Sequence, residues 1–211
     1  IITIDGPASA GKGTLSRQLA EQIGANHLDN GAVFRSATLS LIKSGISITD
    51  SDSAEIIQLI RRTPLSVKWD GKQCKVYLSG TEVTNDITEL EVGRVTSILA
   101  SDRNYFVALS DLTRRMATQG SFISDGRAVG TFIFPNANLK FFVTASPEVR
   151  AQRRYEYLLH QGMIVVYEEV LKDILERDNR DLNREFCPLE IPNDAFIIDT
   201  SNVEPGESLN K

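Results

Sequence analysis

The stretch Gly6-Pro7-Ala8-Ser9-Ala10-Gly11-Lys12-Gly13-Thr14 decides the fold of this 211-residue chain. A glycine, four further residues, and then glycine and lysine is the spacing of a phosphate-binding loop, in which backbone N–H groups curl around an anionic oxygen cluster. We expect all nine residues to bind the phosphates of a nucleotide, with Lys12 bridging the outer ones. The alternative is a loop whose glycines serve only a tight turn.

The sequence on either side of this loop favours phosphate binding. Residues 1–4 form a short apolar run suited to a buried strand, and Leu15, Leu19 and Ile23 recur at helical spacing. Strand, glycine loop and helix is the context that the motif requires. The hydroxyl that usually follows the lysine comes one residue later, as Thr14, because Gly13 fills its place. This variant points to small-molecule kinases, and it makes Thr14 a candidate ligand for Mg²⁺.

Composition excludes several classes of function. A net charge of −5 and a pI near 5.2 argue against a nucleic-acid polymer as partner. No apolar run approaches the roughly 18 residues that cross a bilayer, and no signal-peptide pattern opens the chain, so we expect a cytoplasmic protein without a membrane partner. The cysteines and histidines show no metal-ligand spacing. We expect His27 to lie at a strand edge rather than to act in catalysis.

Strand and helix patterns alternate along the chain. Strands are expected over residues 1–4, 27–29, 121–124, 140–144 and 195–199. Helices are expected over 14–23, 32–43, 52–62 (capped by Asp50 or Ser51), 87–100, 103–118, 147–160 and 166–183. Between 65 and 83 the period changes to two around a turn at Asp70-Gly71, which predicts a small antiparallel β insert. Alternating strands and helices imply an α/β fold with a parallel sheet, whose ligands bind at the carboxyl ends of the strands.

The residues just after each expected strand are therefore candidates for the site. They are the phosphate loop, Asp29-Asn30-Gly31, Asp125-Gly126-Arg127 and the arginine-bearing segment that follows Thr144. Four loops with carboxylates and arginines, brought to one edge of a sheet, would make a site for two phosphorylated molecules.

Three longer stretches carry a resemblance: D-N-G-A-V-F-R at 29–35, D-G-R-A-V-G-T at 125–131 and R-D-N-R-D-L-N-R at 177–184. With them the chain resembles bacterial cytidylate kinase, a family of nucleoside monophosphate kinases, over almost its whole length. The resemblance implies a three-layer P-loop kinase fold. Residues 1–30, 120–145 and 185–211 would form the core, 31–119 the region that binds the nucleoside monophosphate, with the β insert at about 63–84, and 146–184 a helical lid. Family members usually continue through one more C-terminal helix.

The resemblance also implies the reaction, which is transfer of the γ-phosphoryl group of ATP to CMP or dCMP with Mg²⁺ as cofactor. Phosphoryl transfer needs mainly the alignment of two polyanions and the neutralisation of charge. The expected catalytic residues are the cations Lys12, Arg127, Arg153, Arg154, Arg177 and Arg180. The expected acceptor contacts are Arg35 and Arg127 to the phosphate, Ser97, Arg177 and Asp181 to the sugar, and Asn30 and Arg184 to the base, with Asp125 beside them. Asp125 is also expected to hold a water of the Mg²⁺ shell.

Three departures from the family cluster on the acceptor side. Asn30 stands where the family typically has serine, Phe106 where it has an arginine, and Ala128 where it has the aspartate of D-G-R-D. One lost charged hydrogen bond is worth about 1.5–3 kcal/mol, so we expect weaker discrimination between CMP and UMP. The amide of Asn30 can donate or accept and compensates in part. Arg103 or Arg114 is an alternative occupant of the position assigned to Phe106.

The sequence leaves other functions open. The same fold could phosphorylate another acceptor, such as UMP or shikimate, whereas adenylate kinase fits the acceptor stretches less well. A nucleotide-binding protein that transfers no phosphate is the alternative from another class. Read singly, Asp125 could be a structural cap and residues 177–184 a solvated helix face. We expect a monomer.

Overall fold

The computed structural model describes residues 1–45, 53–69, 74–117 and 120–203. Its main sheet has five parallel strands in the order β2-β6-β1-β7-β8. The strands are β1 (Ile2–Asp5), β2 (Asn26–Asp29), β6 (Phe122–Gly126), β7 (Leu139–Thr144) and β8 (Phe196–Asp199). In this register Asp29 lies opposite Asp125, and Asp5 lies opposite Gly126. The prediction of an α/β fold with a parallel sheet is confirmed.

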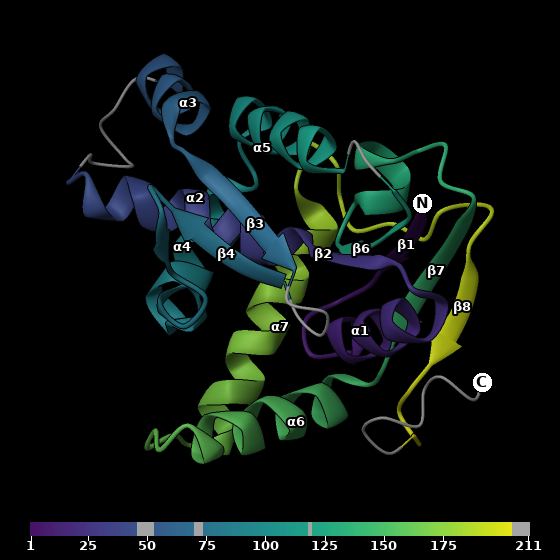
Figure 1. Cartoon of the computed structure of the whole chain (residues 1–211). Coiled ribbons are helices and arrows are strands. Elements are labelled where there is room, and N and C mark those ends of the chain that lie inside the picture. The colour runs from purple at the N-terminus through teal and green to yellow at the C-terminus, as the bar shows by residue number, and fades with distance from the viewer. Residues whose placement is uncertain (46–52, 70–73, 118–119, 204–211) are drawn as a thin grey trace.

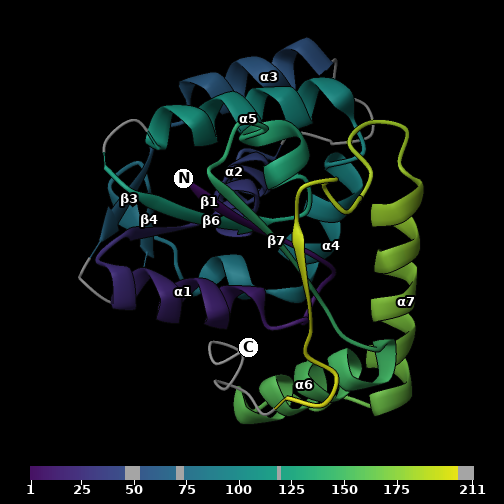
Figure 2. The same ribbon diagram turned by 90° about the vertical axis from the view of Figure 1, so that its right-hand side faces the viewer.

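Helices cover both faces of this sheet, and its central strands β1 and β6 are buried on both sides. Helix α1 (Lys12–Ile23) lies on one face, while α2 (Asn30–Lys43) and α5 (Arg103–Met116) lie on the other (Figure 2). Leu15 of α1 packs with Ile4 and Ile123, which have no exposed surface. On the opposite face Val33 of α2 packs with Leu28. The result is the expected three-layer P-loop kinase fold.

The β insert is also present. It is an antiparallel sheet of β3 (Leu65–Trp69), β4 (Cys74–Leu78) and β5 (Thr81–Glu82), which follows α3 (Ser53–Arg62). Val76 and Val83 have almost no exposed surface and pack with Leu39 of α2. The predicted turn at residues 70–71 and the predicted caps at residues 50 and 51 lie outside the described residues.

Two further helices, α6 (Pro147–His160) and α7 (Tyr167–Asn183), pack against each other and lie beside the sheet (Figure 1). Helix α7 also contacts α4 (Leu90–Leu99). Ser146 accepts a hydrogen bond from the Val149 N–H and Pro147 takes the first helical position, a favourable helix start. Ala8 of the phosphate loop packs with Ala151 of α6 and Ile174 of α7. The helix pair is therefore seated directly on the loop.

Several expected boundaries differ from the observed ones by a residue or more, and two of the differences have a clear local reason. The helix expected from residue 32 begins at Asn30, because the Asp29 side chain caps it by accepting from the Ala32 N–H at 2.8 Å. The helix expected from residue 87 is split into a 3₁₀ turn, η1 (Asp86–Thr88), and α4, because Glu89 between them is extended. A π-helical turn, η2 (Val129–Ile133), follows β6 and was not expected. Across the described ranges, every helix is too short or too polar to cross a membrane.

Candidate active site

The phosphate loop joins β1 to α1 and depends on glycine at two positions. Gly6 has φ +146°, and a Cβ there would lie 1.9 Å from the Val143 carbonyl oxygen, so no other residue fits. Gly11 has φ +93° and begins α1. The loop therefore ends at a helix N-terminus, where free backbone N–H groups and the helix dipole favour an anion.

Lys12 is buried beside this loop, with 6% of its surface exposed. Its Nζ donates to the Pro7 carbonyl at 2.6 Å. Burial first, and the nearby Arg127 charge second, lower the pKa of Lys12 to about 7, although Asp125 acts in the opposite direction. An anion bound next to Nζ would stabilise the charged form.

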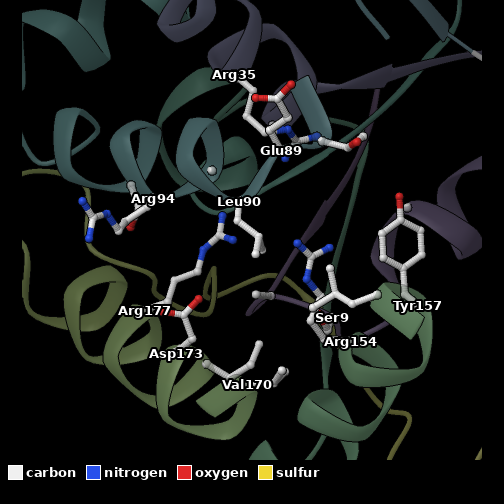
Figure 3. Close-up of a pocket in the computed structure, with 18 of the residues that line it drawn as sticks. Ser9, Arg35, Glu89, Leu90, Arg94, Arg154, Tyr157, Val170, Asp173 and Arg177 are labelled. Carbon is white, nitrogen blue, oxygen red and sulfur yellow. The ribbon is translucent and has the colours of Figure 1, made fainter. Parts of the chain in front are cut away.

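A cavity of about 550 Å³ opens next to the loop. It lies between the ends of β2 and β6, the helices α2 and α4, and the pair α6–α7. Seven cationic and five acidic side chains line it, so the cavity has an excess of positive charge although the chain is acidic. Figure 3 shows Arg154 and Arg177 extending from α6 and α7 into the space faced by Arg35. This excess suits a phosphorylated ligand.

Two arginines of the cavity have guanidinium N–H groups that donate no hydrogen bond to the described residues. Burial, followed by repulsion from Arg127, lowers the pKa of Arg177 to about 9. The Nε atoms of Arg35 and Arg177 are buried and have no hydrogen-bond partner among the described residues. Because planar guanidinium groups bind phosphate through two parallel hydrogen bonds, these side chains can take up anionic oxygens.

Asp181 of α7 holds two of these arginines in place. It is 5% exposed, and its Oδ2 accepts from Arg127 Nε at 2.9 Å and lies 4.0 Å from Arg177 Nε. Burial alone would raise the pKa of Asp181, but Arg127 and Arg177 hold it below its usual value. The carboxylate is therefore ionised and orients both guanidinium groups.

Asp125, at the end of β6, lies next to Asp29 across the sheet. Its Oδ1 is 2.5 Å from His27 Nε2. Burial alone would lower the pKa of His27, but the hydrogen bond and charge of Asp125 raise it. Within the described ranges, no three acidic, histidine or cysteine side chains gather as a ready metal site. A single carboxylate at a phosphate loop nevertheless suits Mg²⁺, which is commonly held by one or two carboxylates, waters and substrate phosphates.

The structure brings most of the predicted site residues together. Those that line the cavity are Ala8, Ser9, Lys12, Gly13, Arg35, Ser97, Asp125, Arg127, Arg154, Arg177 and Arg180. Those that belong to the adjoining loop or to neighbouring structure without lining it are Gly6, Pro7, Ala10, Gly11, Thr14, Asn30, Asp181 and Arg184. The Thr14 hydroxyl accepts from Arg17 at 3.4 Å.

Arg153 is the one predicted catalytic residue that the structure places away from the cavity. Its guanidinium donates to Thr200 Oγ1 at 3.0 Å and to the carbonyls of Thr200 and Val203 at 2.7 and 3.0 Å. These bonds tie α6 to the segment that follows β8. The two neighbouring arginines of α6 thus have different surroundings, and Arg154 is the one that faces the cavity.

Two of the three positions that depart from the family, Phe106 and Ala128, lie in an aromatic cluster. The rings of Phe34, Phe106, Phe132 and Phe186 meet edge to face, with centroids 5.2–5.9 Å apart. Phe106 is 3% exposed and Ala128 1% exposed. Neither position offers a polar side-chain atom for reading a base.

The remaining polar groups near this cluster are largely engaged. Arg184 donates to the Cys187 carbonyl and stacks on Phe106, but its buried Nη2 has no hydrogen-bond partner within the part of the chain described. Asn30 Oδ1 pairs with the Thr113 hydroxyl at 2.8 Å. Of the two alternatives for the missing arginine, Arg103 lies over the Phe186 ring, and Arg114 donates to the carbonyls of η2.

Sequence patterns missed several site residues. Arg150 is 3% exposed; it donates to both oxygens of Asp178, at 3.0 and 2.5 Å, and to the carbonyls of Ala8 and Ala145. No spacing signals this pair, because its members lie 28 positions apart on two helices. Arg94 and Asp173 also line the cavity, and only the packing of α4 against α7 brings them there.

The chain is similar to known proteins over almost its whole length. Residues 2–211 match the family model described as "Cytidylate kinase". A cytidylate kinase of Caldicellulosiruptor bescii is 40% identical over 211 residues, which cover all of this chain and 92% of that protein. A cytidylate kinase of Geobacter sp. (strain M21) is 37% identical over 99% of this chain and 89% of its own length. Among solved structures, a gluconokinase from Sinorhizobium meliloti 1021 has a TM-score of 0.46 and 15% identity, over 99% of this chain and 86% of that one. On the family match and the curated relatives, this chain belongs to the cytidylate kinase family.

Proposed function

We propose that this protein transfers the γ-phosphoryl group of ATP to CMP or dCMP, giving ADP and CDP or dCDP. The observation that carries the proposal is the convergence of the buried Lys12 and of half-buried arginines from α2, the end of β6, α6 and α7 on one cavity. Such a cavity holds two phosphorylated molecules with their reacting groups next to each other, which is what phosphoryl transfer requires.

On the donor side, the backbone N–H groups of the phosphate loop and the Lys12 ammonium bind the ATP phosphates. Lys12 is buried and already points at the loop, where its Nζ is bonded to Pro7. The bound phosphates would take the place of that carbonyl. Lys12 is therefore the residue whose removal most directly weakens both ATP binding and transfer.

On the acceptor side, Arg35 and Arg127 bind the phosphate of CMP, and Asp181 keeps Arg127 oriented. Ser97 and Arg177 face the sugar. An oxygen of the CMP phosphate bonds to the γ-phosphorus while the bond between that phosphorus and the β,γ-bridging oxygen breaks, and ADP leaves with the electron pair. A phosphate oxygen is already a competent nucleophile at neutral pH, so the reaction needs no general base.

The helix pair α6–α7 acts as a lid that brings Arg154, Arg177 and Arg180 onto the moving phosphoryl group and excludes water. Arg180 lies 3.4 Å from the Ser97 hydroxyl of α4, so the lid reaches the acceptor side. Arg153 would take part only if it left its bonds to Thr200 and Val203. Because of those bonds, we assign Arg153 a smaller share of catalysis than Arg154.

Mg²⁺ is the second cofactor that we propose. Asp125 and Thr14 are the side chains of the site that would hold it or its water shell, and the ion would neutralise charge on the ATP phosphates. The single carboxylate of Asp125 facing the phosphate loop fits an ion that keeps several waters.

The base is read with few polar groups, so we propose that selectivity for CMP and dCMP over UMP is modest. Arg184 keeps one buried nitrogen without a hydrogen-bond partner among the described residues, and Asn30 offers an amide. A guanidinium donor serves a carbonyl oxygen that cytosine and uracil share, and so cannot separate them.

The test is an assay of ADP release from ATP and Mg²⁺ with CMP, dCMP, UMP or AMP as acceptor, for the wild type and Lys12→Met. Turnover with CMP or dCMP that Lys12→Met loses would support the proposal. ATP binding without turnover on any acceptor would favour the nucleotide-binding protein that transfers no phosphate. We also propose a cytoplasmic monomer, which elution from a sizing column at twice the expected mass would contradict.

A further inference from the structure

A buried histidine contacts Asp125 from outside the cavity. His27 lies on the edge strand β2 with 5% of its surface exposed, and it does not line the cavity. Asp29 is the residue of β2 opposite Asp125, and His27, two positions earlier, shares its face of the sheet. From that diagonal position the imidazole Nε2 reaches Asp125 Oδ1 at 2.5 Å.

This bond decides which carboxylate oxygen faces the phosphate loop. Asp125 Oδ1 is turned to His27, whereas Oδ2 lies 3.8 Å from the point where a Cβ of Gly13 would stand. Gly13 belongs to the first turn of α1 and lines the cavity. Oδ2 is therefore the oxygen presented to a bound nucleotide phosphate and its ion.

Packing alone does not explain a histidine at this position. His27 Nδ1 is buried and has no hydrogen-bond partner within the described residues. A buried polar atom without a partner costs folding free energy, which an apolar side chain of similar size would avoid. Among the described residues, the ring hydrogen-bonds to Asp125 alone, so a function for His27 would act through that carboxylate.

We propose that His27 is a positioning residue: it fixes the Asp125 carboxylate with Oδ2 toward the phosphate loop, ready for Mg²⁺ that arrives with ATP. The inference rests on the proposed function. Groups that hold a ligating carboxylate typically change metal affinity about 10–100-fold when they are removed. His27 therefore acts on the response to Mg²⁺ rather than on nucleotide binding itself.

The test measures binding of a fluorescent ATP analogue, once in EDTA and once over a Mg²⁺ titration, for the wild type and three variants. His27→Leu removes the hydrogen bond to Asp125. His27→Gln places an amide nitrogen near the former position of Nε2, whereas the shorter side chain of His27→Asn keeps its amide nitrogen out of reach of Asp125. For His27→Leu and His27→Asn we expect binding in EDTA within about twofold of the wild type and a half-saturating Mg²⁺ concentration raised at least about tenfold. His27→Gln should recover most of the wild-type response.

A double-mutant cycle with Asp125→Asn checks that His27 acts through Asp125. His27→Leu should add nothing to the Mg²⁺ response of Asp125→Asn, because the two changes remove one interaction. A wild-type Mg²⁺ response in a folded His27→Leu or His27→Asn variant, or additive effects in the cycle, would overturn the inference. If His27→Leu does not fold, the matched pair of Gln and Asn decides alone. A wild type that does not bind ATP would instead overturn the proposed function.

Discussion

Nucleotide binding to this protein should take up a proton, because Lys12 is only partly charged in the free protein. Burial and the charge of Arg127 lower the pKa of Lys12 to about 7, against 10.5 for an ordinary lysine. Phosphate oxygens next to Nζ favour the charged form and raise its pKa again. Above pH 7, ATP binding is therefore accompanied on average by uptake of more than half a proton from solution.

The magnitude follows from the pKa of about 7 in the free protein. Lys12 is about one tenth neutral at pH 6, half neutral at pH 7 and about nine tenths neutral at pH 8. If it is fully charged in the complex, binding takes up about 0.1, 0.5 and 0.9 protons at these three pH values. The affinity for ATP then falls about tenfold from pH 6 to pH 8, or about 1.4 kcal/mol.

Isothermal titration calorimetry in two buffers of different ionisation enthalpy measures this uptake. The control is Lys12→Met, which keeps the length of the side chain and removes the titrating group. ATP itself loses a proton in this range, and this loss is common to both proteins. Arg177, with a pKa of about 9, stays mostly charged up to pH 8. The difference between wild type and variant therefore belongs to Lys12.

The pH dependence of the free energy of unfolding gives a second, independent test of the lowered pKa of Lys12. Between the folded pKa of about 7 and the unfolded value of 10.5, the unfolded chain binds more protons than the folded one. The Lys12 contribution to the free energy of unfolding should thus rise with pH above 7, by up to about 1.4 kcal/mol per pH unit, and Lys12→Met should lack it. Equal proton uptake by wild type and Lys12→Met at pH 8 would refute the lowered pKa.

Three further outcomes are expected. Gly6→Ala should abolish ATP binding, because its Cβ would lie 1.9 Å from a carbonyl oxygen of β7. Gly11→Ala has open space around it and should lower the free energy of unfolding by only about 1 kcal/mol. A binding assay and an unfolding assay measure these two effects, and ATP binding retained by Gly6→Ala would contradict the prediction. Arg150→Met should lower the free energy of unfolding by about 3–5 kcal/mol in a denaturant titration, because it leaves the mostly buried carboxylate of Asp178 without its partner. A loss below about 1 kcal/mol would argue against this ion pair as a stabilising contact between α6 and α7. The kcat/KM for CMP should exceed that for UMP by no more than about tenfold, since the base region is mostly aromatic, and a ratio above about a thousandfold would show a polar contact that this account lacks.

Much of the fold could be predicted because its signals are local. The phosphate loop fixes a strand before it and a helix after it, and the strands that follow read as short apolar runs between turn residues. The helix from Pro147 to His160 was predicted with its observed bounds. The start of α2 was predicted two residues too late, because Asn30-Gly31 resembles a turn. In the structure the Asp29 side chain caps the helix, which therefore begins at Asn30.

Only the site residues that lie within sequence motifs could be predicted. Lys12 follows from the phosphate-loop motif, and Arg35, Arg127 and Arg177 follow from the stretches that carry the family resemblance. All four line one cavity. The contact between His27 and Asp125 could not be predicted, because its members lie 98 positions apart and meet only through the pairing of β2 with β6. Sequence also could not distinguish adjacent arginines of one helix, whose surroundings depend on tertiary packing.

Phosphorus NMR of the protein with ATP, Mg²⁺ and CMP would decide whether the protein is a kinase, because it observes the transferred phosphoryl group itself. We expect CDP and ADP to appear in equal amounts, and we expect Lys12→Met to form neither at a comparable rate. ADP and inorganic phosphate without CDP would show that the cavity hydrolyses ATP rather than aligning it with a second phosphate. No ADP under conditions where ATP binds would contradict the kinase activity altogether.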